Sequence, residues 1–119
     1  MVLVVDDDRE WRETVGEFLG VKGYTIQSAA NGSEALEFSK HYQTPPELIL
    51  LDLNMPILDG WGFLAARDSV SQLAKVPVVV MSASIGIDRK AKEAGAAAVL
   101  QKPIAPQTLL RMIELVCGR

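Results

Sequence analysis

Five short runs of apolar residues alternate along the chain with segments whose apolar residues recur every three or four positions. Short apolar runs without this helical spacing predict strands that are buried on both faces. The predicted strands are residues 2–5, 24–29, 48–52, 76–81 and 98–101. Five alternations of strand and helix predict an α/β fold, in which a parallel sheet is covered by helices on both sides.

The ends of the intervening helices are marked by capping residues, glycines and prolines. Asp8 and Ser33 are placed to cap the first two helices, and Pro106 suits the first turn of the last. The predicted helices run from Arg9 to Gly20–Gly23, from Ser33 to about Tyr42, onward from Asp59-Gly60, from about Asp88 to Ala94, and from Pro106.

Two helices have a predicted inner face. In the third, Trp61, Leu64 and Ala65 share one face and Phe63 flanks it. The inner stripe of the fifth helix consists of Leu109, Met112, Ile113 and Val116.

Length and composition narrow the class of protein. A chain of 119 residues is expected to form one domain over residues 1–119, and its net charge of −3 favours neither nucleic acid nor a membrane surface as a partner. No apolar run approaches the ~20 residues of a membrane-spanning helix, and residues 1–8 do not resemble a signal peptide. The single cysteine, Cys117, suits a reducing compartment, so we expect a cytoplasmic location.

Polar side chains follow four of the predicted strands. Because the carboxyl ends of parallel strands lie on one edge of a sheet, these residues should meet in one crevice, where ligands of open α/β sheets bind. They are Asp6 and Asp7 after strand one, Asp52 and Asn54 after strand three, Ser82 after strand four, and Lys102 after strand five.

Three carboxylates crowded together favour a cation between them, and hard oxygen ligands at a partly open site suit Mg²⁺. Their charge of −3 is balanced by Lys102 and a divalent ion. A phosphoryl group could then approach Asp52, with its oxygens stabilised by the metal, by Lys102 and by the Ser82 hydroxyl. The residues therefore predict a metal-assisted phosphoryl acceptor, in which Asp52 becomes an aspartyl phosphate.

Four motifs together resemble the receiver domain of bacterial two-component response regulators. They are VLVVDDD at 2–8, LILLDLNMPILDG at 48–60, MSA at 81–83 and QKP at 101–103, and the resemblance covers essentially the whole chain. It implies a flavodoxin-like fold with strand order 2-1-3-4-5. It also implies a signalling switch rather than an enzyme. The only reactions expected of it are its own phosphorylation and slow dephosphorylation.

The resemblance also implies a role for each residue at the sheet edge. Asp52 is the expected phosphoacceptor, and Asp6, Asp7, Asp52 and the backbone carbonyl of Asn54 are the expected ligands of Mg²⁺ or Mn²⁺. Ser82 is the expected switch hydroxyl. Lys102 is expected to pair with the phosphoryl group and to precede Pro103 through a cis peptide bond. The implied donor is a histidine kinase or a histidine phosphotransfer protein, for which small acyl phosphates substitute.

The chain departs from the family pattern at two places. Val99 stands where receivers usually carry an aromatic residue, and the segment from Ser82 to Lys102 is short, which predicts a truncated fourth helix. The fourth helix, fifth strand and fifth helix form the expected output face. The partner of this face is unknown. Leu110 and Leu115 lie off the inner stripe of the fifth helix, and two alternatives stay open for them: half-exposed contacts to a partner or a second copy of the chain, or scattered surface leucines. We expect a stand-alone regulator or, from the abrupt start, a piece of a larger protein.

Three other functions compete with this interpretation. A phosphohydrolase with an aspartate nucleophile usually has a second carboxylate two residues later, where this chain has Asn54. A flavin- or nucleotide-binding module needs a first loop that attracts phosphate, which Asp6-Asp7-Asp8 would repel. The third alternative is a degenerate receiver that acts only as a docking module. Because Val99 replaces the aromatic residue that receivers usually carry, this alternative stays open.

Overall fold

The central sheet has five parallel strands in the order β2-β1-β3-β4-β5. The structure is a computed structural model, and it describes residues 1–118. The strands are β1 (Val2–Val5), β2 (Ile26–Ala29), β3 (Leu48–Asp52), β4 (Val78–Ser82) and β5 (Ala98–Gln101). The predicted α/β class and strand order are therefore confirmed.

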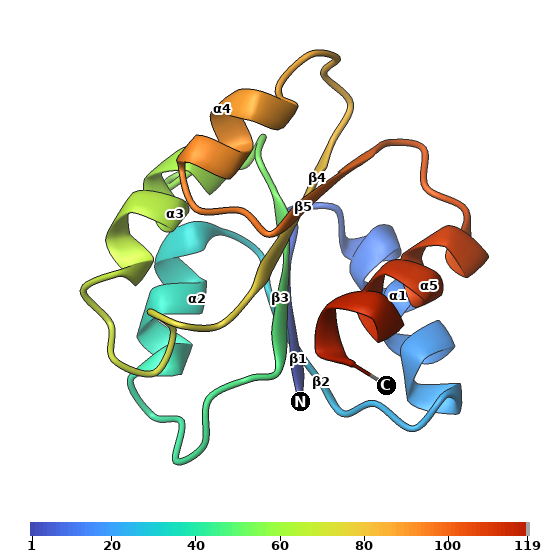
Figure 1. Ribbon diagram of the computed structural model, residues 1–119. Coiled ribbons are helices and arrows are strands. Elements are labelled where there is room, and N and C mark those ends of the chain that lie inside the picture. Colours follow the sequence, from blue (N-terminus) through green and yellow to red (C-terminus); the bar gives the residue numbers. More distant parts are fainter. Residues whose placement is uncertain (119) are drawn as a thin grey trace.

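Five helices cover the two faces of the sheet. They are α1 (Arg9–Val21), α2 (Gly32–Ser39), α3 (Gly60–Arg67), α4 (Asp88–Glu93) and α5 (Pro106–Cys117). In Figure 1 the sheet is seen on edge, with α2, α3 and α4 on one side and α1 and α5 on the other. Within residues 1–118, no helix is long and apolar enough to span a membrane.

The apolar strands divide the core in two because successive side chains point to opposite faces. Leu3 and Val5 of β1 pack in the cluster under α2 and α3, whereas Val2 and Val4 pack in the cluster under α1 and α5. All five residues of β3 are buried. The central strands are therefore fixed from both sides, and so are the positions of the residues that follow them.

Several element boundaries differ from the predicted ones. Asn31, not Ser33, caps α2, because its side chain accepts the Glu34 N–H at 2.8 Å. This helix ends at Ser39 rather than near Tyr42. Strand β2 begins at Ile26, since the Tyr24 N–H bonds to the Leu19 carbonyl and closes α1. Strand β4 begins at Val78 and continues to Ser82.

The inner face of α3 also differs from the predicted one. Phe63, Leu64 and Arg67 are buried, and Ala65 is exposed. Arg67 lies on the inner face instead, where its guanidinium donates hydrogen bonds to the backbone carbonyls of Leu73 and Val76. On α5 the predicted stripe is confirmed, with Leu109 and Ile113 buried and Met112 and Val116 half-buried; Leu115 is 76% exposed.

Candidate phosphoacceptor and metal site

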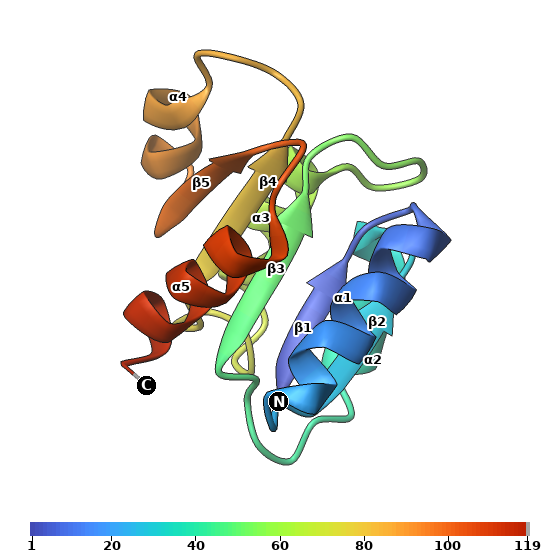
Figure 2. The ribbon, with the colours of Figure 1, turned by 90° about the vertical axis from the view of Figure 1, so that its right-hand side faces the viewer.

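The register of the sheet brings the predicted residues together at one edge. Val5 pairs with Leu51, so Asp6 and Asp52, the next residue on each strand, lie side by side. On the other side Asp52 pairs with Met81, and Ser82 pairs with Gln101, directly before Lys102. Figure 2 shows this edge as the end to which the strand arrows point.

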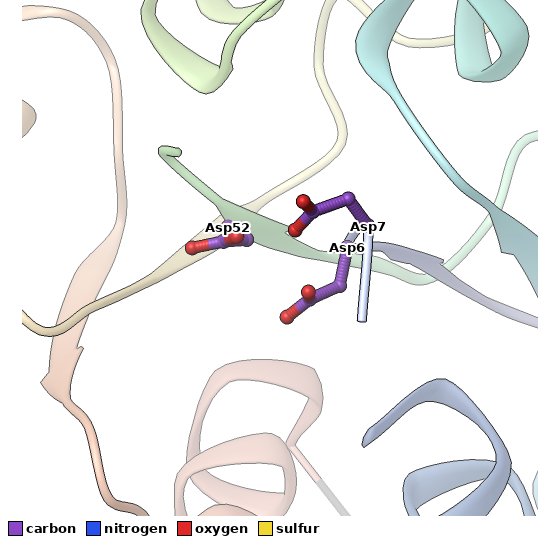
Figure 3. A group of neighbouring side chains, drawn as sticks. All are labelled: Asp6, Asp7 and Asp52. Atoms are coloured by element: carbon purple, nitrogen blue, oxygen red, sulfur yellow. The ribbon is translucent and has the colours of Figure 1, made fainter. Parts of the chain in front are cut away.

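Three carboxylates form a group at this edge. Asp6, Asp7 and Asp52 each offer an oxygen, and these oxygens lie within 4.8 Å of one another. Figure 3 shows Asp6 and Asp7 leaving the end of β1 beside Asp52. Asp6 and Asp52 are buried whereas Asp7 is exposed, which leaves one side of the group open to solvent.

The group fits Mg²⁺ by the chemistry and the spacing of its donors. All three oxygens lie close enough together to reach one cation placed among them, and hard carboxylate oxygens are the ligands that Mg²⁺ prefers. The exposed Asp7 leaves room for the waters that Mg²⁺ retains. The Asn54 carbonyl, the fourth expected ligand, belongs to an exposed residue two positions after Asp52.

Lys102 lies between the two buried carboxylates. Its Nζ atom is 3.0 Å from Asp6 Oδ2 and 3.5 Å from Asp52 Oδ1. Burial lowers the pKa of Lys102, but the hydrogen bonds and charges of Asp6 and Asp52 together outweigh burial, and the pKa is raised. Lys102 therefore remains a cation at the position where a phosphoryl oxygen would need one. As predicted, the Lys102–Pro103 peptide bond is cis.

Asp52 has the surroundings of a reactive carboxylate. Burial and the nearby charge of Asp6 raise its pKa, while Lys102 and the backbone N–H of Asn54 lower it in part. A raised pKa means that the negative form of Asp52 is under-stabilised. A cation bound to the Asp52 carboxylate should therefore be favourable. A reaction that spreads its negative charge over more atoms should be favourable for the same reason.

Ser82 is buried at the end of β4, and its hydroxyl accepts the Ser84 N–H at 3.0 Å. Its backbone carbonyl accepts the Lys102 N–H at 2.7 Å, so the two residues share a backbone contact.

The start of α3 packs closely against β3: a Cβ on Gly60 would lie 2.6 Å from the Asp52 carbonyl oxygen. Only glycine allows that approach.

Asp8 takes its predicted place as a helix cap, and the single histidine lies away from the sheet edge. Asp8 caps α1 by accepting the Trp11 N–H at 3.2 Å. His41, which is exposed, follows α2 and faces Glu37 of that helix, so it lies outside the site.

Three features of this region were not predicted. Arg12 donates a hydrogen bond of 2.7 Å to the Asp6 carbonyl and fixes the turn after β1. Ile57 has a positive φ of 69° in the loop after β3, where a branched side chain is rare, so no sequence signal indicated it. Trp11 lies near Lys102, with Nζ 6.0 Å from the centre of its ring.

The family model described as "Response regulator receiver domain" matches residues 2–114. The transcriptional regulatory protein PrrA of Mycobacterium leprae is 35% identical over 120 residues, which cover 99% of this chain and 50% of PrrA. The chain thus spans about half the length of that relative.

Two solved structures illustrate the structural similarity. The chemotaxis response regulator CheY4 of Vibrio cholerae has a TM-score of 0.88 and 32% identity, covering 97% of this chain and 96% of CheY4. The signal receiver domain of a signal transduction histidine kinase from Syntrophus aciditrophicus has a TM-score of 0.85 and 25% identity, covering 98% of this chain and 89% of that domain.

Proposed function

This chain belongs to the response regulator receiver domain family, and from that premise we propose that it is a signalling switch controlled by phosphorylation of Asp52. The observation that carries the proposal is the position of Asp52, buried and under-stabilised between Lys102 and the carboxylates of β1. Receiver domains of response regulators work with histidine kinases. We propose a phosphohistidine of such a kinase, or of a phosphotransfer protein, as the donor.

In the proposed reaction an Asp52 oxygen forms a bond to phosphorus while the bond from phosphorus to the donor's nitrogen or oxygen breaks. Lys102 is close enough to stabilise one phosphoryl oxygen, and the Ser82 hydroxyl proton is available for a second. Asp6, Asp7, Asp52 and the Asn54 carbonyl would hold Mg²⁺, which supplies charge stabilisation to the transferring group.

The switch follows from the charge that phosphorylation adds. A phosphoryl group carries about −1.5 to −2 charges at neutral pH. It would compete with Asp6 for Lys102 and draw the Ser82 hydroxyl from the Ser84 N–H. Because Ser84 lies in the loop between β4 and α4, this movement would act on α4, β5 and α5, which we propose as the output face. Partners of that face include a second copy of the chain.

Asn54 argues against turnover of external phosphoesters. A phosphohydrolase needs a general acid and base near the leaving group, and an amide provides neither. We therefore propose a regulatory phosphoacceptor rather than an enzyme.

The test is intact mass after incubation with Mg²⁺ and acetyl phosphate. We expect one phosphoryl adduct on the wild type, none on Asp52→Asn, and none when a chelator is present. Asp59→Asn is the matched control, because Asp59 is an exposed cap of α3 that asparagine replaces well, and it should be phosphorylated like the wild type.

Two results would contradict the proposal. An adduct that survives in Asp52→Asn would place the acceptor elsewhere. No wild-type adduct from acetyl phosphate or from phosphorylated kinases would instead indicate a docking module.

A further inference from the structure

Arg12 of α1 reaches across to the end of β1. Its Nη1 atom donates a hydrogen bond of 2.7 Å to the backbone carbonyl of Asp6. Asp6 is fully buried and follows the last residue pair of β1 with its neighbouring strands, so its carbonyl lies beyond the ladder of the sheet. A buried carbonyl in such a place needs another donor. Arg12 supplies it, and within residues 1–118 its guanidinium forms no ion pair.

The other polar groups of Asp6 have partners as well. Its N–H donates to the Ala29 carbonyl at 3.1 Å. One carboxylate oxygen accepts the Asp8 N–H at 2.9 Å, and the other accepts from Lys102 at 3.0 Å. Lys102 is the partner for which a phosphoryl group would compete. The remaining contacts, that of Arg12 among them, would then have to hold Asp6 in place.

The same contacts determine the position of Asp7, the exposed carboxylate of the acidic group (Figure 3). On one side its backbone is held by Asp8, whose side chain caps α1. On the other side it is held by Asp6, whose carbonyl Arg12 binds. A metal ligand on a turn that is fixed at both ends loses less conformational freedom when the ion binds, so the ion is bound more tightly.

We propose that Arg12 is a positioning residue for the metal site: by holding the Asp6 carbonyl, it keeps the turn of Asp6 and Asp7 in the conformation that binds a divalent cation. The inference rests on the proposed function, in which this group of carboxylates holds Mg²⁺. The hydrogen bond of Arg12 is to the backbone and not to a carboxylate. Its effect should therefore appear in the affinity for the ion rather than in the rate of phosphorylation at saturating ion.

The positive charge of Arg12 makes the sign of the effect informative. A guanidinium beside the acidic group repels a cation, so removing its charge alone should strengthen cation binding. Removing its hydrogen bond loosens the turn, which should weaken cation binding. Losing a group that orients a metal ligand typically costs about tenfold or more in affinity. The positioning role therefore predicts weaker binding by Arg12→Met, even though this variant has one positive charge fewer.

The experiment titrates Mn²⁺, which accepts the same oxygen ligands as Mg²⁺, into the wild type, Arg12→Met and Arg12→Lys. Free Mn²⁺ is measured by electron paramagnetic resonance at a temperature at which circular dichroism shows each protein to be folded. Arg12 is half-buried and lines a surface hollow between α1 and β2, so its replacement leaves no void in the core.

We expect Arg12→Met to bind Mn²⁺ about tenfold more weakly than the wild type. Arg12→Lys should recover most of this loss, because its ammonium can donate to the same carbonyl. At saturating Mg²⁺ the rate at which acetyl phosphate phosphorylates Arg12→Met should be within about twofold of the wild-type rate, since only binding of the ion is affected.

Arg9→Met is the matched control. Arg9 lies on the same helix, is exposed and pairs with Glu13 at 3.0 Å, so this variant loses the same charge while the turn after β1 keeps its contacts. It should bind Mn²⁺ at least as tightly as the wild type.

Two results would overturn the positioning role. One is an Arg12→Met protein that binds Mn²⁺ as tightly as the wild type or more tightly, and the other is an Arg12→Lys protein that binds no better than Arg12→Met. A wild type without saturable Mn²⁺ binding would instead contradict the metal site of the proposed function, whose phosphoacceptor is tested separately by the mass of the adduct.

Discussion

The acidic group at the ends of β1 and β3 and the guanidinium of Arg67 are both buried, but their charges are compensated in opposite ways. Arg67 is 7% exposed and donates to the carbonyls of Leu73, Ala74, Val76 and Gly95 at 3.0–3.1 Å. It forms no ion pair within the described part of the chain. The carboxylates of Asp6, Asp7 and Asp52 have one ammonium, that of Lys102, among them.

The difference distinguishes the Arg67 guanidinium, which stabilises the fold, from the three carboxylates, for which we propose a chemical role. Arg67 joins the end of α3 to the segments before β4 and β5 through its two terminal nitrogens, whereas its Nε has no partner among the described residues. The acidic group carries a formal charge of −2 when Lys102 is included, which a divalent cation would cancel. A crowded group of like charges with one counter-charge indicates a binding site more strongly than a single buried charge whose terminal nitrogens are held by backbone carbonyls.

Replacing Arg67 should have the largest effect on stability. In Arg67→Met four carbonyls lose their donor, and we expect the free energy of unfolding to fall by about 3 kcal/mol. Urea denaturation measures it. Phosphorylation of the folded fraction should stay within twofold of the wild type.

The control for Arg67 is Arg89→Met, which removes an exposed ion pair with Glu93 and should cost less than about 1 kcal/mol. Equal losses in the two variants would mean that the hydrogen bonds of Arg67 contribute nothing beyond a surface contact.

Replacing Lys102 should have a smaller effect on stability and a larger one on chemistry. Without its ammonium the three carboxylates repel one another, so Lys102→Met should lower the free energy of unfolding by about 2 kcal/mol in chelator. Adding Mg²⁺ should recover part of this loss. The rate of phosphorylation by acetyl phosphate should fall at least about tenfold, because one stabilising group is removed from the transition state.

The control for Lys102 is Lys92→Met on α4, which is exposed and outside the site. It should change neither quantity. A Lys102→Met protein that is phosphorylated at the wild-type rate would remove Lys102 from the proposed mechanism.

The contrast between these two regions also shows what the sequence could predict. The acidic group was predictable because three apolar strands, β1, β3 and β4, are unambiguous, and parallel strands bring whatever follows them to one edge. Strand order came from the resemblance, since alternation alone does not specify it. Arg67 was not predictable: an arginine in the last turn of a helix is usually exposed, and its partners are carbonyls up to 28 positions away.

The other errors have the same origin in competing local signals. Asn31 and Ser33 are both good helix caps, and only the closeness of Gly32 to Leu58 favours the earlier start. The closeness of Trp11 to Lys102 was not predictable either, because it depends on the path of the chain after β5.

Replacing Asp52 should have the smallest effect on stability, and its sign depends on conditions. Because folding raises the pKa of Asp52, its ionised form destabilises the native state, and Asp52→Asn should be about 1 kcal/mol more stable than the wild type at pH 7 in chelator. As pH falls through the raised pKa, the wild-type carboxyl becomes neutral and the difference should disappear. Thermal unfolding of the wild type and of Asp52→Asn at several pH values measures this.

Saturating Mg²⁺ should reverse the order of the two proteins. The ion binds the wild-type carboxylate in the native state and stabilises it in proportion to the logarithm of its concentration, whereas the amide of Asp52→Asn is a weaker ligand. The buried carboxylates then have a divalent cation beside them in addition to Lys102. A wild type that stays less stable than Asp52→Asn at all Mg²⁺ concentrations would mean that the acidic group is strained without being a metal site.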